Sequence, residues 1–238
     1  MRRVGLLLFM MAALIVPANA QKILHKAEKV FNWGGKIGCN SLFSNINSLS
    51  INDVEMVGVQ QRYKVGFQAS LFGRVNIDKF YLEPSLTWQQ SESYIHFDLP
   101  DTDNVLRNVY QVYSSNSLDC KYKTVEIPIM IGYNIVKEDD YAMSLSVGPS
   151  FRYNYKIDLS SSLSETLRVT KDENTPLGLG ISIGAGASIG RLFLNFIYQF
   201  GINEVDSDIH KIVSGDQEWT LRLKKRTNVM NFSLGFML

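Results

Sequence analysis

The sequence predicts an all-β protein, an eight-stranded antiparallel up-and-down transmembrane β-barrel, and three observations support this fold class. Eight segments alternate apolar and polar side chains over about ten residues, the length that a tilted membrane-spanning strand needs. The connections between the segments are alternately short and long, as tight turns and outer loops are in such barrels. The chain also ends on an alternating segment, and a barrel that closes on its last strand needs that strand fully paired.

The first four segments each present one apolar and one polar face. Successive side chains of a strand point to opposite faces, so Phe67 and Leu71 share a face, with Lys64 and Gln68 on the other. An even number of strands then predicts that both termini lie on the periplasmic side. These four predicted strands span residues 33–43, 62–75, 79–89 and 121–133.

The polar face of the sixth segment consists of Gly and Ser alone. We expect this face to leave room inside the barrel for bulky side chains such as Tyr81 and Phe72. Short connections are predicted at 76–78, 134–140 and 190–191, and long ones after the first, third, fifth and seventh strands. The last four predicted strands span 141–155, 177–189, 192–202 and 229–238.

The final segment reads V-M-N-F-S-L-G-F-M-L and predicts the strand that closes the barrel against the first one. Its apolar face would meet lipid, and its last residues would be the terminal signal that barrel-assembly machinery recognises. The residues assigned to this closing-strand signal are Phe232, Leu234, Phe236 and Leu238.

Aromatic side chains are expected at both membrane interfaces, as in other barrels. Trp88 would lie at the outer interface with Tyr153 and Tyr155. Two outer connections, around Ile95 to Leu99 and around Trp219 to Leu223, alternate again and are predicted to form hairpins beyond the membrane. The residues expected at the periplasmic interface are Phe80, Tyr133, Tyr141 and Phe236.

The N-terminus has the three parts of a secretory signal peptide. Arg2 and Arg3 precede an apolar run over 4–16, and Ala18-Asn19-Ala20 is a cleavage site of the A-x-A type. The run is too short for a spanning helix, which needs about 20 apolar residues. The predicted organisation is a signal peptide at 1–20, a periplasmic leader at 21–31 and the barrel domain at 32–238.

The charge and cysteine content of the chain limit the kinds of partner and site that the protein can have. A net charge of +1 gives no basic field for nucleic acid. Cys39 and Cys120 fall on predicted strands that are not neighbours, so two free thiols are favoured. A disulfide between them is the alternative that the sequence leaves open. The sequence contains no C-x-x-C motif that would suggest a metal or redox site.

Charged residues on the inward face predict an ion-pair network inside the barrel. The lumen of an eight-stranded barrel is filled by side chains, and buried charges must be paired. We expect Glu83 and Glu126 to accept hydrogen bonds from the basic residues, which makes the network a polar plug that stabilises the fold. A gated path for protons or small ions is the alternative. The residues of the predicted network are Lys36, Lys64, Glu83, Glu126 and Arg152.

The sequence predicts no catalytic residues, no cofactor and no metal site. The histidines are His25, His96 and His210, and no Gly-x-Ser-x-Gly or other ordered triad motif accompanies them. A lipid-modifying enzyme with outer-loop histidines is the less favoured alternative. Asp206-x-Asp208-x-His210 could form a weak surface calcium site, but carboxylates at this spacing more commonly solvate a loop.

Four short motifs, in this order and at this spacing, resemble the PorT-like family of outer-membrane β-barrel proteins from Bacteroidetes-type bacteria. The resemblance implies an eight-stranded barrel in the outer membrane of a Gram-negative bacterium. One namesake is tied to a protein-secretion apparatus, and Cys39 stands where the family more often has a small residue such as Ala. The motifs are Gly34–Asn40, Phe80–Leu86, Val125–Pro128 and Val147–Phe151.

The expected role is that of a barrel with a packed lumen and a structural or interaction function, such as an accessory subunit of a secretion or uptake complex. The partners expected are outer-membrane lipid, the barrel-assembly machinery and a protein of the cell envelope. A small-solute channel is the main alternative.

Overall fold

The computed structural model describes residues 30–51, 54–98, 115–138, 140–161, 177–203, 205–214 and 217–238. The predicted signal peptide and nearly all of the predicted leader lie outside these residues. In the described part of the chain, no helix is long and apolar enough to cross a membrane.

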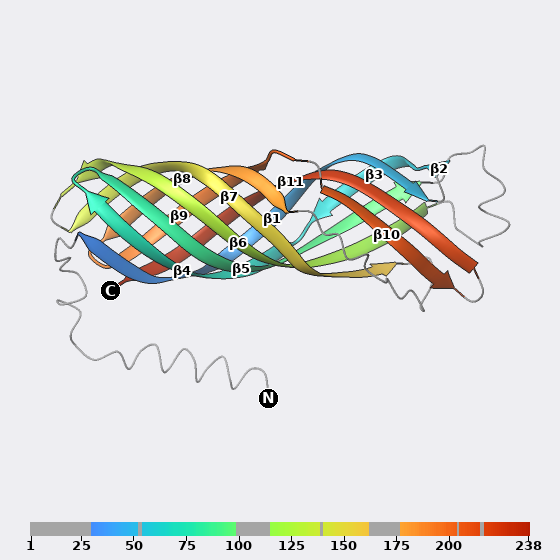
Figure 1. Ribbon diagram of the computed structural model, residues 1–238, viewed down its shortest axis with the longest axis horizontal. Coiled ribbons are helices and arrows are strands. Elements are labelled where there is room, and N and C mark those ends of the chain that lie inside the picture. Colours follow the sequence, from blue (N-terminus) through green and yellow to red (C-terminus); the bar gives the residue numbers. More distant parts are fainter. Residues whose placement is uncertain are drawn as a thin grey trace, which may run out of the picture.

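Eight antiparallel strands form a closed ring, which confirms the predicted fold class (Figure 1). Each strand pairs with the next, and the last pairs with the first. In ring order the strands are β1 (Phe31–Ile51), β4 (Val65–Ile77), β5 (Phe80–Asp98), β6 (Ser115–Lys137), β7 (Tyr141–Ser161), β8 (Gly178–Ile189), β9 (Leu192–Gly201) and β11 (Gln217–Met237).

The two ends of the barrel differ. At one end, called the turn end below, short connections join β4 to β5, β6 to β7, and β8 to β9. Asp78 and Gly190 occupy the left-handed region there, with φ of 54° and 57°, a conformation that Gly and Asp tolerate in tight turns. At the other end, the loop end, three further strands extend the ring (Figure 1). They are β2 (Val54–Glu55), β3 (Val57–Tyr63) and β10 (Val205–Ser214), which pair with β1, β5 and β11 respectively.

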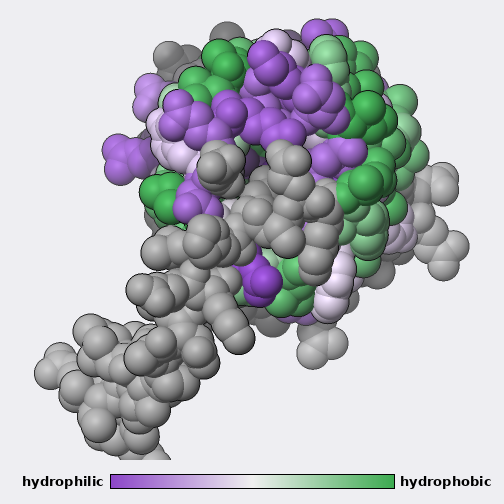
Figure 2. Space-filling model, turned by 90° about the vertical axis from the view of Figure 1, so that its left-hand side faces the viewer, coloured by the Kyte–Doolittle hydropathy of each residue, from purple (hydrophilic) through white to green (hydrophobic). Residues whose placement is uncertain are grey.

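The wall has an apolar outside and a mainly polar inside. On β4 from Val65 to Phe72 and on β5 from Phe80 to Thr87, exposed and buried residues alternate without a break. The exposed residues of the wall include large apolar side chains such as Ile37 on β1 and Leu71 on β4, each 66% exposed, as a lipid-facing surface requires. Figure 2, viewed from the turn end, shows hydrophobic residues around the flank and hydrophilic residues gathered on the near end.

Aromatic side chains contact one another at two levels of the outer wall. Near the turn end, the rings of Phe80 and Tyr133 lie 5.0 Å apart. Toward the loop end, the Trp88 indole Nε1 donates a hydrogen bond of 2.7 Å to the Tyr155 hydroxyl. The part of the wall between these two levels is the segment that spans the membrane.

Five strands run well beyond the Trp88 level, so the predicted length of about ten residues is wrong for them. Strands β1, β5, β6, β7 and β11 contain 21, 19, 23, 21 and 21 residues. Ile95 to Asp98 continue β5 and pair with β6, and Trp219 to Leu223 continue β11 and pair with β10. Residues 99–114 of the first predicted hairpin lie outside the described residues. This loop-end extension has an apolar core of its own, in which four side chains are at most 4% exposed: Leu49, Met56, Ile95 and Phe97.

The wall is lower on one side of the loop end. Pairing between β7 and β8 stops at Arg152 opposite Gly178. Pairing between β9 and β11 stops at Gln199 opposite Val229. Because β8 and β9 have only 12 and 10 residues, the wall steps down between the longer strands β7 and β11.

Candidate functional site: the barrel lumen

The turn-end half of the lumen is organised around one buried carboxylate, that of Glu83. Lys36 Nζ donates a 2.7 Å hydrogen bond to Glu83 Oε1, and Arg74 Nε donates one of 2.7 Å to Oε2. All three residues are at most 6% exposed. The Arg74 guanidinium also stacks 4.3 Å from the centre of the Tyr81 ring, a cation–π contact.

Apolar side chains close the lumen below this ion cluster. The rings of Phe72 and Phe193 meet edge to face at 5.2 Å, and Met237 packs with them. A side chain at Gly235 would clash with the Phe193 ring. A layer of ring, thioether and guanidinium groups therefore fills this part of the turn end.

The room for these bulky side chains does not come from β8, as the sequence had suggested. An added Cβ at Gly132, on β6, would lie only 2.0 Å from Tyr81 Cζ. Phe72 packs against Gly34 on β1, where a Cβ would lie 3.0 Å from the ring. The glycines of β8 instead lie between small inward residues of β7 and larger ones of β9. A Cβ at Gly184 would lie 3.2 Å from Ile197 Cγ1, and one at Gly186 would lie 2.6 Å from Asn195 Oδ1.

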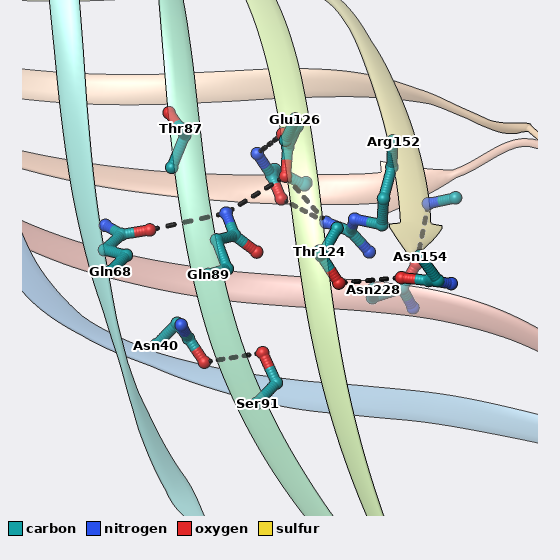
Figure 3. Close-up of polar contacts among 12 residues, drawn as sticks. Asn40, Gln68, Thr87, Gln89, Ser91, Thr124, Glu126, Arg152, Asn154 and Asn228 are labelled. Atoms are coloured by element: carbon teal, nitrogen blue, oxygen red, sulfur yellow. Dashed lines mark hydrogen bonds and ion pairs between the residues drawn. The ribbon is translucent and has the colours of Figure 1, made fainter. Parts of the chain in front are cut away.

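A second polar layer crosses the middle of the lumen and is centred on Glu126, which is completely buried. Arg152 Nη2 donates to Glu126 Oε2 at 3.1 Å and to Gln199 Oε1 at 2.6 Å. The Gln199 and Gln89 amides also donate to the Glu126 carboxylate. Figure 3 shows Gln89, Glu126 and Arg152 pointing toward one another from β5, β6 and β7.

The structure therefore brings together four of the five residues of the predicted network in two separate ion pairs, Lys36 with Glu83 and Arg152 with Glu126. Arg74 was not among the residues predicted for the network, although it has the inward parity of Gln68 on the same strand. Extending the alternation of β4 by three more inward positions would have found it.

The assignment of Lys64 to the lumen is wrong. Its side chain is 44% exposed, and its ammonium lies 2.7 Å from Asp119 Oδ1. This hydrogen bond raises the pKa of Lys64 above its ordinary value. Lys64 lies between β3 and β4, where the chain leaves the wall and three consecutive residues, Tyr63 to Val65, are all exposed. Alternation cannot assign a face where the strand is interrupted.

The closing strand occupies its expected place in the ring. Phe232, Leu234 and Phe236 lie opposite Cys39, Ile37 and Gly35 of β1. Phe232, Leu234 and Leu238 are 43–50% exposed on the outer wall. The amide of Leu238 donates a 2.7 Å hydrogen bond to the Trp33 carbonyl. Recognition of these residues by assembly machinery stays a prediction.

A third cluster fills the lumen above the Trp88 level, where the barrel has left the membrane. Lys225 Nζ donates a 2.6 Å hydrogen bond to the Tyr122 hydroxyl and lies 3.9 Å from the centre of that ring. Burial lowers the pKa of Lys225 to about 8. Neighbouring Cys120 is buried, and burial raises the pKa of its thiol. Both cysteines are free, and Cys39 lies on the exposed outer wall.

The described residues give no constellation for catalysis or metal binding. His96 Nε2 lies 3.9 Å from Asp98 Oδ1 in an exposed pair. No group of three His, Cys, Asp or Glu side chains in the described part of the chain could hold a metal ion. His25 and the side chains of Asp206, Asp208 and His210 lie outside the described residues.

Comparison with known proteins agrees with this architecture. OprG from Pseudomonas aeruginosa superposes with a TM-score of 0.58 at 11% sequence identity, covering 90% of this chain and 97% of OprG. Neisserial surface protein A has a TM-score of 0.40 at 12% identity, covering 87% of this chain and 97% of its own. No curated protein sequence matches the chain significantly. At such identities the likeness to OprG shows the fold alone.

The family described as outer membrane protein beta-barrel domain matches residues 19–207, well over half of the chain. The closed ring, the lipid-facing outer wall and this match lead to one assignment: the chain belongs to the outer membrane protein β-barrel domain family and lies in the outer membrane.

Proposed function

We propose that the protein is a closed outer-membrane barrel whose loop-end extension binds a protein of the cell envelope, as an accessory subunit of a secretion or uptake complex. The observation that carries this proposal is the extension itself. It continues the barrel beyond the membrane on strands of up to 23 residues, and its interior is packed with apolar side chains. A packed extension of this kind is suited to present a fixed surface to a partner.

The outer face of the extension carries charges of both signs. Lys121 lies 3.3 Å from Glu92, and Lys156 lies 3.3 Å from Asp158. Exposed pairs of this kind contribute little to stability, typically below about 1 kcal/mol. They are therefore available to exchange partners with a complementary protein surface.

The proposal includes the finer assignment to the PorT-like family of Bacteroidetes-type bacteria, for which the sequence motifs are the support. It also places both termini in the periplasm, so that the loop end faces outward. We further propose that the protein is not an enzyme and needs no cofactor. A strain carrying His96→Ala and His210→Ala should keep an unchanged lipid profile, and an altered profile would revive the lipid-modifying alternative.

Site-specific photo-crosslinking in native outer membranes tests the interaction. A photoreactive residue replacing Lys121 should give one discrete adduct, and the same residue replacing Lys137 near the turn end serves as the control. Charge reversal at Lys156 should weaken the Lys121 adduct and leave the barrel folded. Identical adducts at both positions, or none at Lys121, would contradict the proposal.

A further inference from the structure

The inner face of the barrel is not uniformly packed. On β4 from Gly66 to Arg74, and along β5 from Tyr81 to Phe97, every inward residue is buried. On β7 the inward residues are partly exposed up to Ser146, buried at the next two positions, and partly exposed again from Arg152. On β9 the inward residues Phe193, Asn195 and Gln199 are buried, whereas Ile197 and Gly201 are partly exposed.

Small residues account for the difference between the two sides. The inward positions of β8 from Gly178 to Ser188 are all Gly or Ser, and those of β7 from Ser144 to Ser150 are likewise Ser or Gly. Bulky inward side chains, among them Phe72, Tyr81 and Glu83, come from the opposite strands β4 and β5. The wall formed by β7 and β8 is therefore lined by short side chains, which Tyr81 reaches from across the lumen: its hydroxyl donates a 3.2 Å hydrogen bond to Ser144 Oγ.

Seven buried polar side-chain atoms have no hydrogen-bond partner among the described residues, and three of them lie on or beside this side. They are Ser182 Oγ, Asn231 Oδ1 and Arg152 Nε. Buried polar atoms are satisfied by protein or by ordered water in the great majority of cases. Ser182 lies opposite Gln199, and Asn231 lies opposite Ile197. At 0% and 4% exposed, both belong to the closed stretch in the line of partly exposed positions on this side.

One layer interrupts this line, the hydrogen-bonded set of Glu126, Arg152 and Gln199. Directly beyond it, at the step in the wall, lies a pocket of about 30 Å³ lined by Arg152, Gln199 and Gly201 among others. A water molecule needs roughly 10–15 Å³ of such space, so the pocket admits about two.

We propose that the β7–β9 side of the lumen is a conduit for water and the smallest neutral polar solutes, closed at rest by the Glu126–Arg152–Gln199 layer. The walls on the turn-end side of the layer carry no charged side chain from β7 or β8. Within the layer, the charges of Arg152 and Glu126 offset each other. Such a path has no width for a larger solute.

Osmotic water permeability of proteoliposomes, measured by stopped-flow light scattering on the full chain, tests the closure. Gln199→Ala should raise protein-dependent permeability several-fold above wild type. The double variant Glu126→Ala/Arg152→Ala should do the same, and it leaves no unpaired buried charge to unfold the barrel. The matched control is Gln68→Ala, which removes the same amide from the opposite wall and should change nothing.

Heat-modifiable gel migration verifies that each variant is folded. Folded variants at wild-type permeability would overturn the proposal, and so would an equal rise in Gln68→Ala.

Thiol labelling gives a second test that does not depend on opening the layer. In a Cys39→Ser/Cys120→Ser background, Ser146→Cys should react with a small water-soluble thiol reagent. Ser70→Cys, inward on β4 and buried, should stay unreactive. Equal reactivity at the two positions would show that the sides of the lumen do not differ, which would contradict the conduit.

Discussion

Glu83 shows most clearly what a single residue contributes to this barrel. Its carboxylate is the shared acceptor of Lys36 and Arg74, and no water-exposed surface surrounds the three. Breaking a buried pair by removing one partner is strongly destabilising, because the remaining charge loses its compensation.

We expect Glu83→Gln to lower the free energy of unfolding by about 3–5 kcal/mol, since it leaves two buried cations facing a neutral amide. Urea titration of the detergent-solubilised protein, followed by tryptophan fluorescence, measures the effect. Lys64→Met is the control, because its exposed pair with Asp119 should contribute less than about 1 kcal/mol. Similar losses in the two variants would mean that the Glu83 cluster is not the determinant described here.

Lys225 makes stability depend on pH. Its folded-state pKa of about 8 is lower than the ordinary value of 10.5, so the unfolded chain binds more protons between these two values. Stability therefore rises with pH through this window, with a slope of at most about 1.4 kcal/mol per pH unit. The neutral amine is the form that the fold prefers.

Replacing Lys225 by Met should remove this dependence. Wild type should gain stability relative to Lys225→Met as pH rises from 8 to 9, whereas Cys120 and Tyr122, whose pKa values are raised, are present in both proteins. Urea titrations of both proteins at matched pH values measure it. A difference that stays constant with pH would show that the Lys225 amine does not change its charge in this range.

Individual faces, by contrast, were well predicted wherever a strand is continuous. Lys36 and Arg152 were placed inside correctly because alternation has a fixed period of two. Lys64 was misplaced because the chain leaves the wall there, and Arg74 was missed although its parity was available. Which basic residue reaches Glu83 depends on the register between β1, β4 and β5, which local sequence does not encode.

The closing strand β11 has one face toward lipid and one face toward the lumen, and the two faces tolerate different substitutions. Leu234 lies on its lipid face between Ile37 and Leu194 of the neighbouring strands, and Ser233 points into the lumen, where it is 3% exposed. We expect Leu234→Arg to cost about 2–4 kcal/mol, the range for arginine near the bilayer midplane. Ser233→Thr should be far milder in the same titration in lipid vesicles, and equal effects would mean that the two faces are interchanged.

Removing residues 236–238 should abolish assembly. The truncation deletes the pairing of Phe236 with Leu192 and Gly35 and the hydrogen bonds of the Met237 and Leu238 amides. An open barrel edge inside lipid leaves backbone groups without partners, each at a cost of several kcal/mol. Loss of the fast-migrating unheated band on a denaturing gel is the expected result, and its persistence would refute the role given to this terminus.

Strand lengths were the weakest element-level prediction, and β5 explains why. Its odd-numbered residues face inward from Tyr81 to Phe97, but their character changes from polar to apolar near Ile95. The outward residues change in the opposite sense after Trp88. The strand does not turn over. Its surroundings change from lipid to water, so the apolar face passes from outside to inside, and the pattern resembles two separate strands.

At the scale of the whole molecule, ring closure is what allows a polar lumen to exist in a membrane. Every spanning strand has two hydrogen-bonded neighbours, so no sheet edge meets lipid. Three buried layers then fill the interior, around Glu83, Glu126 and Lys225. The step at β8 and β9 breaks the symmetry of this cylinder and defines one side on which the filling is thin.

The sequence by itself determined that this chain forms a membrane barrel, which faces meet lipid, and where the turns lie, because alternation and connection length are local properties. The tertiary structure decided which charges pair, how far the barrel extends beyond the membrane, and on which side the lumen is lined by small residues. These features depend on register and strand stagger, which are set between segments far apart in the chain. The same Gly and Ser residues of β8 look like space for large rings in the sequence and form the wall of a water path in the fold.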